Sequence, residues 1–595
     1  MLELSSLLCV ETRRITLIIG INMKLVLLFI VAFAGCRKIS DTVDNNIVHA
    51  PLTSEVSTLD PANSYDVVSA TVIYQAYETL YEYHYFKRPY TLQPLLAESM
   101  PKVSDDGMTY TIKLKKGIRF HDNPSFGGKP RYLKSVDFLN QIKRLAYIPT
   151  KSTGWWLFDG KIKGINEFRK TVGNDFSKFF STPISGIKTP DEHTIVFDLT
   201  RPYPQMVYAL AMSFTAPMPK ELIEKYQNDM SQIMVGTGPF QLKKWNKLLE
   251  IVLERNPHYR KANYPSQGDR FANDRGYLKD AGKQIPFVDG IHFHVIKEAN
   301  TRWLNFLKNK IDFLVIDKDN FASAVTPSGE LSGELKEKQI KLQVASTLTY
   351  WWLSFNMKDK IVGKNKDLRL AIAHAIDVDK YIKLFTNNVA QKANSIYPPG
   401  IPGYNPSHEL YYKYDIATAK EYLKKAGYPD GKGLPVINYD VRGNSSTSRQ
   451  MAEFIKSELE KVGVRININV NTFPGFLKKA RTGQLQFWRG GWALDYPDSE
   501  NILQLLITKN HSPGPNSSFY SNDKIDEMFK KLAILPNGPQ KYQLMKEMEE
   551  IVEKDLPWAM FYYTRNYILH NNRVFNYRQS DIIYNGFKYI KLGEY

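Results

Sequence analysis

Apolar and polar residues alternate along several short stretches of the chain, and this pattern predicts β-strands with one buried face. The clearest strands are predicted at residues 110–114, 194–199, 240–245, 311–316 and 464–470. Another strand is predicted from Ser54, ending in a turn at Asp60-Pro61.

Apolar residues spaced three or four positions apart predict helices between these strands. The predicted helices cover residues 68–81, 301–309, 367–385, 415–426 and 451–462, and a further one begins near Ser135. Gly427 follows the fourth of them, in a position where glycine commonly ends a helix. Helices and strands therefore alternate, which predicts an α/β chain. Its 595 residues exceed what one hydrophobic core usually holds, so we expect two or three domains.

The N-terminal region has the layout of an export signal. Met23-Lys24 precedes the apolar run of residues 25–34, and Gly35-Cys36 follows directly. A short charged segment, a short apolar segment and small residues in this order are typical of a signal peptide. We expect residues 1–35 to be a signal peptide that is removed, with translation starting at either Met1 or Met23.

Cys36 is a candidate for lipidation. Residues 33–36, Phe-Ala-Gly-Cys, resemble a bacterial lipobox, although Phe33 stands where that pattern prefers Leu. We therefore expect Cys36 to be acylated and to become the first residue of the mature chain, with a plain secretory signal as the alternative. Residues 37–50 are polar and lack periodicity, so residues 36–50 are predicted to form a lipidated tether.

The cysteine count and the charge limit the function classes. Cys9 and Cys36 are the only cysteines, so the folded part of a processed chain has neither a disulfide nor a thiolate metal site. The net charge is +18, but the lysines and arginines are spread along the chain without a basic block. This distribution favours a solvated surface near an anionic membrane over a nucleic-acid partner.

The sequence holds no recognisable catalytic motif, because GxSxG, HExxH and P-loop patterns are all missing. His292 and His294 would share one face of a strand, but a zinc site needs a third ligand and none is evident nearby, so we expect no metal. The carboxylate pairs Asp105-Asp106 and Asp495/Asp498 have the composition of a glycosidase pair. Both also fit turns, where aspartate is favoured for backbone reasons.

Aromatic residues make up 13% of the chain, which suits a recognition cleft as well as a core. Tyr350-Trp351-Trp352 is one dense cluster, and Trp488 with Trp492 is another. Residues 489–497 read Arg-Gly-Gly-Trp-Ala-Leu-Asp-Tyr-Pro and place Asp495 among aromatics and glycines. A carboxylate in this setting is a plausible charge-assisted partner for a ligand amine.

Several segments, taken in order, resemble the family 5 extracellular solute-binding proteins, which include the oligopeptide- and dipeptide-binding receptors of ABC importers. The segments are residues 59–61, 77–81, 95–99, 106–107, 110–111, 116–122, 236–240, 256–259, 356, 368–372, 375–377 and 419–428. Each is weak alone. Their shared order and spacing extend the resemblance over nearly the whole mature chain.

This resemblance implies an α/β, two-lobed periplasmic-binding-protein-like fold with a hinge and an extra small domain, as in the large peptide receptors. Lobe I would comprise the discontinuous residues 51–90, 200–346 and 561–595. Residues 91–199 would form the small extra domain, and residues 347–560 would form lobe II. Closure on a ligand would then be a hinge motion.

The resemblance also implies a ligand site. In the family's peptide receptors a carboxylate in a Trp-x-x-Asp stretch pairs with the peptide's free amine, and Trp492 and Asp495 hold these two places here. Arg489 holds the place of an arginine that can meet a peptide carboxylate, and the backbone near Gly491 is expected to pair with an extended ligand. The remaining expected ligand-binding residues are Tyr65, Asp66 and Val67, from a loosely matching opposite strand, and Tyr350.

We therefore expect a substrate-binding lipoprotein that captures oligopeptides and delivers them to an ABC permease, without enzymatic activity or a cofactor. Its expected partners are a peptide, the transmembrane subunits of the permease and a membrane reached through the lipid anchor, and it is expected to be a monomer. The expected location is the cell envelope, on the outer face of the cytoplasmic membrane or in the periplasm. The alternative is the same fold binding an oligosaccharide, an opine or a metal complex.

Overall fold

The computed structural model describes residues 46–593, except for Pro89, Asn228, Pro327, Pro402, Pro536 and Asp581. The chain from Val48 to Tyr595 forms one unit and is described by itself. The predicted signal peptide, Cys36 and most of the predicted tether lie outside the described residues. None of the helices in the described part is both long enough and apolar enough to cross a bilayer.

The largest sheet has the strand order β13-β19-β14-β18-β16-β17, with β15 paired to β19 beside this path. Its strands are β13 (Phe313–Val315), β14 (Lys341–Phe355), β15 (Gln391–Lys392), β16 (Ile437–Val441), β17 (Ile466–Val470), β18 (Phe487–Ala493) and β19 (Trp558–His570). β14 is antiparallel to both β18 and β19, whereas β16 is parallel to β17 and β18. The parallel β16–β17 pair is joined by helix α14 (Ser446–Glu460), as a crossover between parallel strands requires.

A second sheet has the order β1-β12-β9-β8. Its strands are β1 (Ile47–Leu52), β8 (Phe240–Asn246), β9 (Glu250–Arg255) and β12 (Gly290–Val295). β1 therefore includes residues 47–50, which we had placed in the tether, and the strand predicted from Ser54 does not form. Within residues 47–52 every second side chain is buried, namely those of Val48, Ala50 and Leu52. This alternation gives the segment one apolar face, which is why it joins the sheet.

The third sheet, of order β4-β5-β7-β6, lies wholly within residues 91–199. It consists of β4 (Lys102–Val103), β5 (Thr109–Lys113), β7 (Thr194–Asp198) and β6 (Ile187–Asp191), with helices α3 (Ser135–Ala146) and α4 (Ile165–Val172) in the same region. The alternation that predicted β5 and β7 holds, because every second residue is buried in both strands. Three two-stranded pairs complete the sheets: β2 (Tyr81–Tyr83) with β3 (Leu92–Pro94), β10 (Ala262–Asn263) with β11 (Gln284–Ile285), and β20 (Val574–Phe575) with β21 (Lys591–Leu592).

The helix predictions were confirmed with two corrections. The helix predicted for residues 367–385 is two helices, α11 (Lys366–Ala375) and α12 (Val378–Thr386), because Asp377 is extended and caps the second. The helix predicted for residues 68–81 is only α2 (Val67–Ile73), since the chain turns and enters β2 at Tyr81. The predicted helices near residues 301 and 415 form as α8 (Ala299–Leu307) and α13 (Ile416–Lys425).

The remaining α-helices of the described chain are shorter or lie in its C-terminal third. They are α5 (Met206–Ala209), α6 (Lys220–Tyr226), α7 (Arg270–Asp274), α9 (Phe321–Ala324), α10 (Gly333–Glu337), α15 (Phe473–Arg481), α16 (Glu500–Leu503), α17 (Asp523–Leu532) and α18 (Pro539–Asp555).

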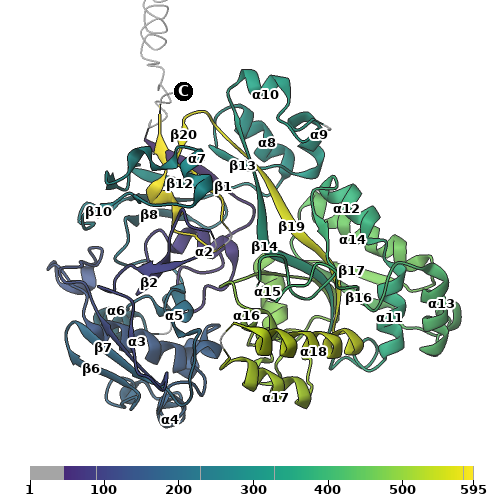
Figure 1. Cartoon of the computed structure of the whole chain (residues 1–595), viewed down its shortest axis with the longest axis horizontal. Coiled ribbons are helices and arrows are strands. Elements are labelled where there is room, and N and C mark those ends of the chain that lie inside the picture. The colour runs from purple at the N-terminus through teal and green to yellow at the C-terminus, as the bar shows by residue number, and fades with distance from the viewer. Residues whose placement is uncertain are drawn as a thin grey trace, which may run out of the picture. The chain divides into compact units, whose positions relative to one another are not determined.

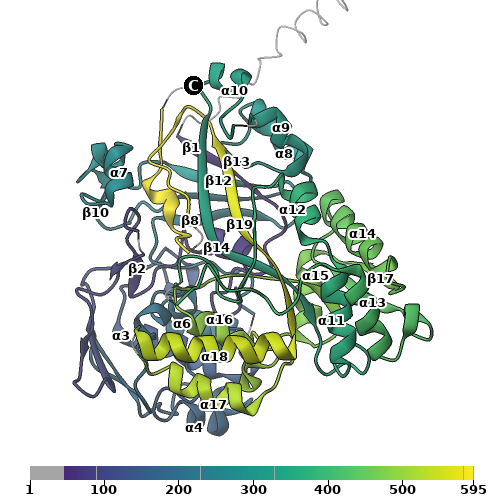
Figure 2. The ribbon, with the colours of Figure 1, turned by 45° about the vertical axis from the view of Figure 1, so that its right-hand side comes forward.

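β14 and β19 are the two long strands that link the part with β13 and α8–α10 to the part with α11–α18 (Figure 1). Figure 2 shows the same two strands side by side from another direction. Their ladder is regular from Lys341 to Ser346, and its register shifts between Ser346 and Tyr350 and again between Trp351 and Trp352. The largest hydrophobic core of the described residues includes side chains from both parts, among them Phe313 of β13 and Met548 of α18.

Buried ion pairs connect the C-terminal segment to residues that lie much earlier in the chain. Arg573 holds Asp312 through two hydrogen bonds of 2.7 Å, with both side chains almost fully buried. Lys588 likewise pairs with the buried Glu82 at 2.7 Å. Removing one partner of such a pair leaves a buried charge without compensation, so these pairs fix where the last residues lie.

Candidate functional site

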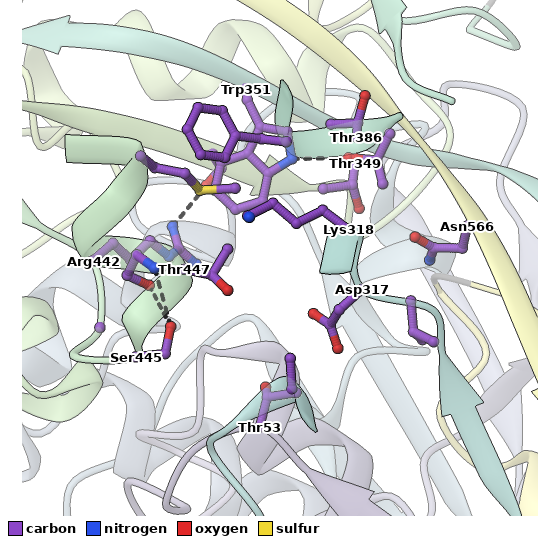
Figure 3. Close-up of a pocket in the computed structure, with 18 of the residues that line it drawn as sticks. Thr53, Asp317, Lys318, Thr349, Trp351, Thr386, Arg442, Ser445, Thr447 and Asn566 are labelled. Atoms are coloured by element: carbon purple, nitrogen blue, oxygen red, sulfur yellow. Dashed lines mark hydrogen bonds between the residues drawn. The ribbon is translucent and has the colours of Figure 1, made fainter. Parts of the chain in front are cut away.

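A cavity of about 570 Å³ is the candidate site, because residues from five distant parts of the chain meet around it. Figure 3 shows Thr53, Asp317, Thr386, Ser445 and Asn566 around this space, each from a different region of the chain. Its volume falls within the roughly 300–1,000 Å³ typical of sites for small ligands.

Strand β14 contributes one wall of the cavity. Thr349 and Trp351 line it, whereas Tyr350 lies between them on the opposite face and is fully buried. Successive side chains of a strand point to opposite faces, so Tyr350, which was expected to contact the ligand, does not line this cavity, whereas Trp351 does. The indole N–H of Trp351 donates to Oγ1 of Thr564 at 2.8 Å and fixes the ring.

Two arginines give the cavity a positive side. The guanidinium of Arg489 lies over the Trp351 ring at 4.5 Å from its centre and donates to the hydroxyl of Tyr381 at 2.6 Å. Arg442 lies at 5.5 Å from the same ring and donates to the carbonyl of Gly491 at 3.2 Å. Burial, together with the charge of Arg489, lowers the pKa of Arg442 to about 10, which leaves it charged at neutral pH.

Within the described part of the chain, neither Arg442 nor Arg489 forms an ion pair with a carboxylate. Two other cations of the same cavity are neutralised, since Arg302 pairs with Asp317 at 2.7 Å and Lys297 pairs with Glu55. The cavity therefore holds positive charge that an anionic group on a ligand can neutralise.

Asp495 belongs to a group of hydrogen-bonded side chains beside this cavity. Its Oδ2 accepts from the hydroxyl of Tyr65 at 2.9 Å and from Nδ2 of Asn501 at 2.9 Å. Oδ1 of Asn501 accepts from the backbone N–H of Asp495 and from the indole N–H of Trp492. The rings of Tyr65 and Trp492 meet edge to face, with centres 5.3 Å apart.

The structure thus brings together three residues predicted from the sequence, Tyr65, Trp492 and Asp495. It adds Asn501, which the sequence analysis missed. Asn501 lies in α16 with its side chain fully buried, and no sequence pattern marked it out. Its amide orients both the carboxylate of Asp495 and the ring of Trp492.

The carboxyl group of Asp495 has a raised pKa. Burial raises its pKa to about 7, although hydrogen bonds from Asn501 and Tyr65 act in the opposite direction. Asp495 itself does not line the 570 Å³ cavity. Among the described residues no hydrogen bond reaches Oδ1, so this oxygen is open to a further donor.

Glycines let β18 approach β14 closely. A Cβ on Gly491 would lie 2.4 Å from the Trp351 ring, and one on Gly490 would lie 2.5 Å from Nε1 of Trp352. β18 pairs with β14 along its length but with β16 only at Phe487 and Trp488. Beyond Trp488, one edge of β18 is therefore unpaired with any described strand, and the Gly491 carbonyl accepts from Arg442. The pairing of this backbone with a ligand stays a prediction.

A second cavity of about 120 Å³ adjoins the first, and both are lined by Arg442, Gly491 and Trp492. Tyr65 and Trp352 also line it. The indole N–H of Trp352 is buried and has no hydrogen-bonding partner among the described residues. It is therefore a donor that a ligand in this space can use.

The segment predicted as the opposing strand is instead the start of a helix. Asp66 is the N-cap of α2, accepting from the backbone of Ser69 at 2.8 Å and from Oγ of Ser57 at 2.6 Å. Asp66 is therefore engaged in local structure. Val67 is 48% exposed and lines the larger cavity.

The structure gives the second carboxylate of the Asp495/Asp498 pair a structural role. Asp498 is buried and is held by Nζ of Lys541 at 2.9 and 3.0 Å. It also accepts from the backbone N–H of Glu500 at 2.9 Å. A carboxylate neutralised in this way does not act as a glycosidase acid or nucleophile.

Comparison with known families agrees with this picture. Residues 91–514 match the family model "Bacterial extracellular solute-binding proteins, family 5 Middle". The chain belongs to this family. The match confirms the resemblance read from the sequence, and with it the expectation of a transport binding protein in place of an enzyme.

Curated relatives of this family 5 protein align over most of the chain. The dipeptide-binding protein of Escherichia coli K12 is 27% identical over 478 residues, covering 78% of this chain and 79% of the relative. The glutathione-binding protein GsiB of Salmonella typhimurium LT2 is 26% identical over 513 residues, covering 85% of this chain and 86% of the relative.

Solved structures confirm the predicted fold class. DppA of Helicobacter pylori in complex with the peptide STSA has a TM-score of 0.74 and 26% identity, covering 92% of this chain and 98% of that one. The oligopeptide-binding protein OppAIV of Borrelia burgdorferi has a TM-score of 0.75 and 23% identity, covering 92% and 99%. The chain therefore has the α/β, two-lobed fold of the periplasmic peptide-binding proteins.

Proposed function

We propose that this family 5 protein binds short peptides that carry a free amine and a free carboxylate. The observation that carries the proposal is the arrangement of charge around one strand. Arg489 lies on β18 without a carboxylate partner in the described chain, and Asp495 follows the same strand with one open oxygen. A peptide zwitterion supplies the two opposite charges that these groups lack.

The amine of the ligand would bind Oδ1 of Asp495, beside the rings of Tyr65 and Trp492. Its carboxylate would be held by Arg442 and Arg489, whose stacking near Trp351 keeps both guanidinium groups in place. The open edge of β18 after Trp488 offers backbone groups that bind any extended peptide regardless of its side chains. Such a site favours broad specificity for sequence and strict specificity for the charged ends.

Two unpaired arginines also suit a ligand with two carboxylates. The relatives named as glutathione-binding give this idea a direct test, because glutathione carries one amine and two carboxylates. We propose that glutathione binds at least as tightly as a neutral tripeptide of the same length. The matched comparison is calorimetric titration of glutathione and tri-alanine against the same preparation.

Delivery to an ABC permease completes the proposed function. Lobe I (residues 51–90, 200–346 and 561–595) and lobe II (residues 347–560) would move about β14 and β19, where the register break between Ser346 and Tyr350 interrupts the ladder. The extra small domain would be residues 91–199, and the receptor would act as a monomer. Deleting the gene and measuring uptake of a labelled peptide by the cells tests this role, with loss of uptake expected.

The proposed location is the cell envelope, where acylation of Cys36 would hold the protein at the membrane. One acyl chain anchors only marginally, whereas two anchor stably, so diacylation is expected. Cys36→Ser should move the protein from the membrane fraction to the soluble fraction. Retention of the variant at the membrane would refute the anchor.

The ligand class can be tested without prior choice of ligand. The protein is purified from its native host, denatured, and the small molecules it releases are identified by mass spectrometry. Titrations with tri-alanine and maltotriose then compare the two ligand classes. We expect released peptides and binding of tri-alanine only, whereas a released oligosaccharide and binding of maltotriose would overturn the peptide assignment.

A further inference from the structure

Three histidines meet on the second sheet, away from the residues of the ligand site. His49 belongs to β1, and His292 and His294 belong to β12, which is the neighbour of β1 in the sheet. The sequence analysis found only the pair on β12 and expected no metal, because the third histidine is about 245 residues away in the chain. The order of strands in the sheet supplies it.

The three side chains are close enough to share one ion. Nδ1 of His49 lies 3.0 Å from Nε2 of His294, and one ring nitrogen from each of the three lies within 4.8 Å of the others. The rings of His292 and His294 are stacked with centres 3.9 Å apart. Zinc–nitrogen bonds of about 2.0–2.1 Å in tetrahedral geometry place ligand nitrogens roughly 3.3 Å apart. The observed spacing needs only small side-chain rotations to reach that geometry.

The surroundings of the cluster are those of a built metal site. Nε2 of His292 lies 2.6 Å from Oε2 of Glu250 on β9, and Lys244 holds the other oxygen of Glu250 at 2.6 Å. A carboxylate on the outer nitrogen of a histidine fixes the tautomer and leaves the inner nitrogen free to bind a metal. The outer partner of His292 is thus already in place.

The backbone of His49 is fixed on both sides. Its N–H donates to the carboxylate of Asp312 at 2.7 Å, and its carbonyl accepts from the N–H of Asp312 at 2.7 Å. Arg573 in turn holds Asp312 in a buried ion pair. A ligand on a rigidly held strand loses little conformational freedom when it binds a metal.

We propose that His49, His292 and His294 bind one Zn²⁺ ion, with Glu250 as the outer partner of His292 and water as the fourth ligand. The ion would join the first strand of the described chain to the rest of its sheet.

The test uses the untagged full chain, stripped of metal with EDTA, and ZnCl₂ as the only ligand. We expect one equivalent of zinc by calorimetric titration and a higher thermal midpoint with zinc than without it. His49→Gln and His294→Gln should each weaken zinc binding at least tenfold and remove the thermal shift. His258→Gln, at a 40% exposed side chain near Asp122, is the matched control and should bind zinc as the unmutated chain does.

A second readout keeps the proposal testable if a variant folds poorly. Co²⁺ in place of zinc should give the visible absorption of a tetrahedral ion in the unmutated chain and in His258→Gln, and lose it in His292→Gln. Zinc affinity that is equal in the unmutated chain and in a His49→Gln/His294→Gln double variant would overturn the site. So would an octahedral cobalt spectrum in the unmutated chain.

Discussion

At the residue scale, the behaviour of the ligand site rests on the carboxyl group of Asp495. Burial raises its pKa to about 7, against hydrogen bonds from Asn501 and Tyr65. A peptide amine keeps its proton to about pH 8. Below pH 7 the ligand-free carboxyl is protonated, so it must release a proton before it pairs with an amine.

We therefore expect the affinity for a free-amine peptide to fall roughly tenfold per pH unit below pH 7 and to be highest near pH 7–8. Calorimetric titration between pH 5 and 8, in two buffers of different ionisation enthalpy, measures both the affinity and the released proton. Asp495→Asn has no group that titrates here and should give a flat profile. A flat profile in the unmutated protein would contradict the assignment.

The same pKa has the opposite effect on the stability of the ligand-free protein. The folded state keeps this proton up to about pH 7, whereas the unfolded chain releases it near the ordinary pKa of 3.8. The folded state then binds more protons between these values, so the contribution of Asp495 to the free energy of unfolding decreases as the pH rises from about 4 to 7.

Gly491 gives a second residue-scale prediction. A methyl group in Gly491→Ala would lie 2.4 Å from the Trp351 ring, so this ring, which lines the cavity and contacts Arg489, must shift. We expect a loss of about 1–3 kcal/mol in the free energy of unfolding, together with weaker peptide binding.

The control for Gly491→Ala is Gly333→Ala, where an added Cβ meets nothing within 4 Å. This control should leave both stability and binding nearly unchanged, within about 0.5 kcal/mol. Denaturant unfolding and calorimetric titration give the two quantities. Equal stability of the two variants would show that the close approach of β18 to β14 is not required.

At the element scale, the break between α11 and α12 is set by one side chain. Oδ1 of Asp377 accepts from the backbone N–H of Lys380 at 2.9 Å and begins α12. Asp377→Ala should lower the free energy of unfolding by about 1 kcal/mol, the usual cost of losing such a cap. Glu409→Ala, at an exposed side chain, is the control and should change it by less than about 0.5 kcal/mol. Urea unfolding measures the free energy of unfolding of both variants. Equal values would show that the Asp377 cap does not stabilise the start of α12.

This break also shows what the sequence could and could not predict about elements. The strands β5 and β7 were predictable because their sequences alternate apolar and polar residues, and every second side chain is buried in the structure. β8 and β17 also form where they were predicted, although only their first residues, Phe240 and Ile466, are buried. The α11–α12 region keeps its apolar spacing through the break, so periodicity alone predicted one helix. Asp377 was the available signal, and it has meaning only once the backbone there is known to be extended.

The candidate site was predicted in part for a similar reason. Trp492 and Asp495 stood out because they lie close together in the sequence and match a family pattern. Asn501 acts through its tertiary contacts with both residues, and Arg442 reaches the cavity from the loop after β16. The sequence did not show that Thr349 and Trp351, and not Tyr350, occupy the face of β14 that lines the cavity.

At the scale of the whole molecule, the proposed function requires two lobes that close on a ligand. One contact already joins residues of the proposed small domain and lobe II, since Nζ of Lys509 lies 3.0 Å from Asp159. The shared hydrophobic core also spans both proposed lobes. The sequence did not predict this sharing, because it depends on how Leu494, Tyr496 and their neighbours pack across the chain.

Peptide binding should therefore stabilise the molecule and make it more compact. At a peptide concentration about 100 times the dissociation constant, the free energy of unfolding should rise by roughly 2.7 kcal/mol. Small-angle scattering should give a smaller radius of gyration with peptide than without it. An unchanged radius would contradict the hinge, even if the thermal stability rises.

The most direct test of the central claim compares one peptide in two forms against two proteins. The free and N-acetylated forms of a tripeptide are titrated against the unmutated protein and Asp495→Asn, after melting curves show that both are folded. If Asp495 binds the amine, acetylation should cost about 2–5 kcal/mol of binding free energy in the unmutated protein. The same acetylation should cost almost nothing in Asp495→Asn. Equal affinity in all four combinations would contradict the account and reopen the case for a non-peptide solute.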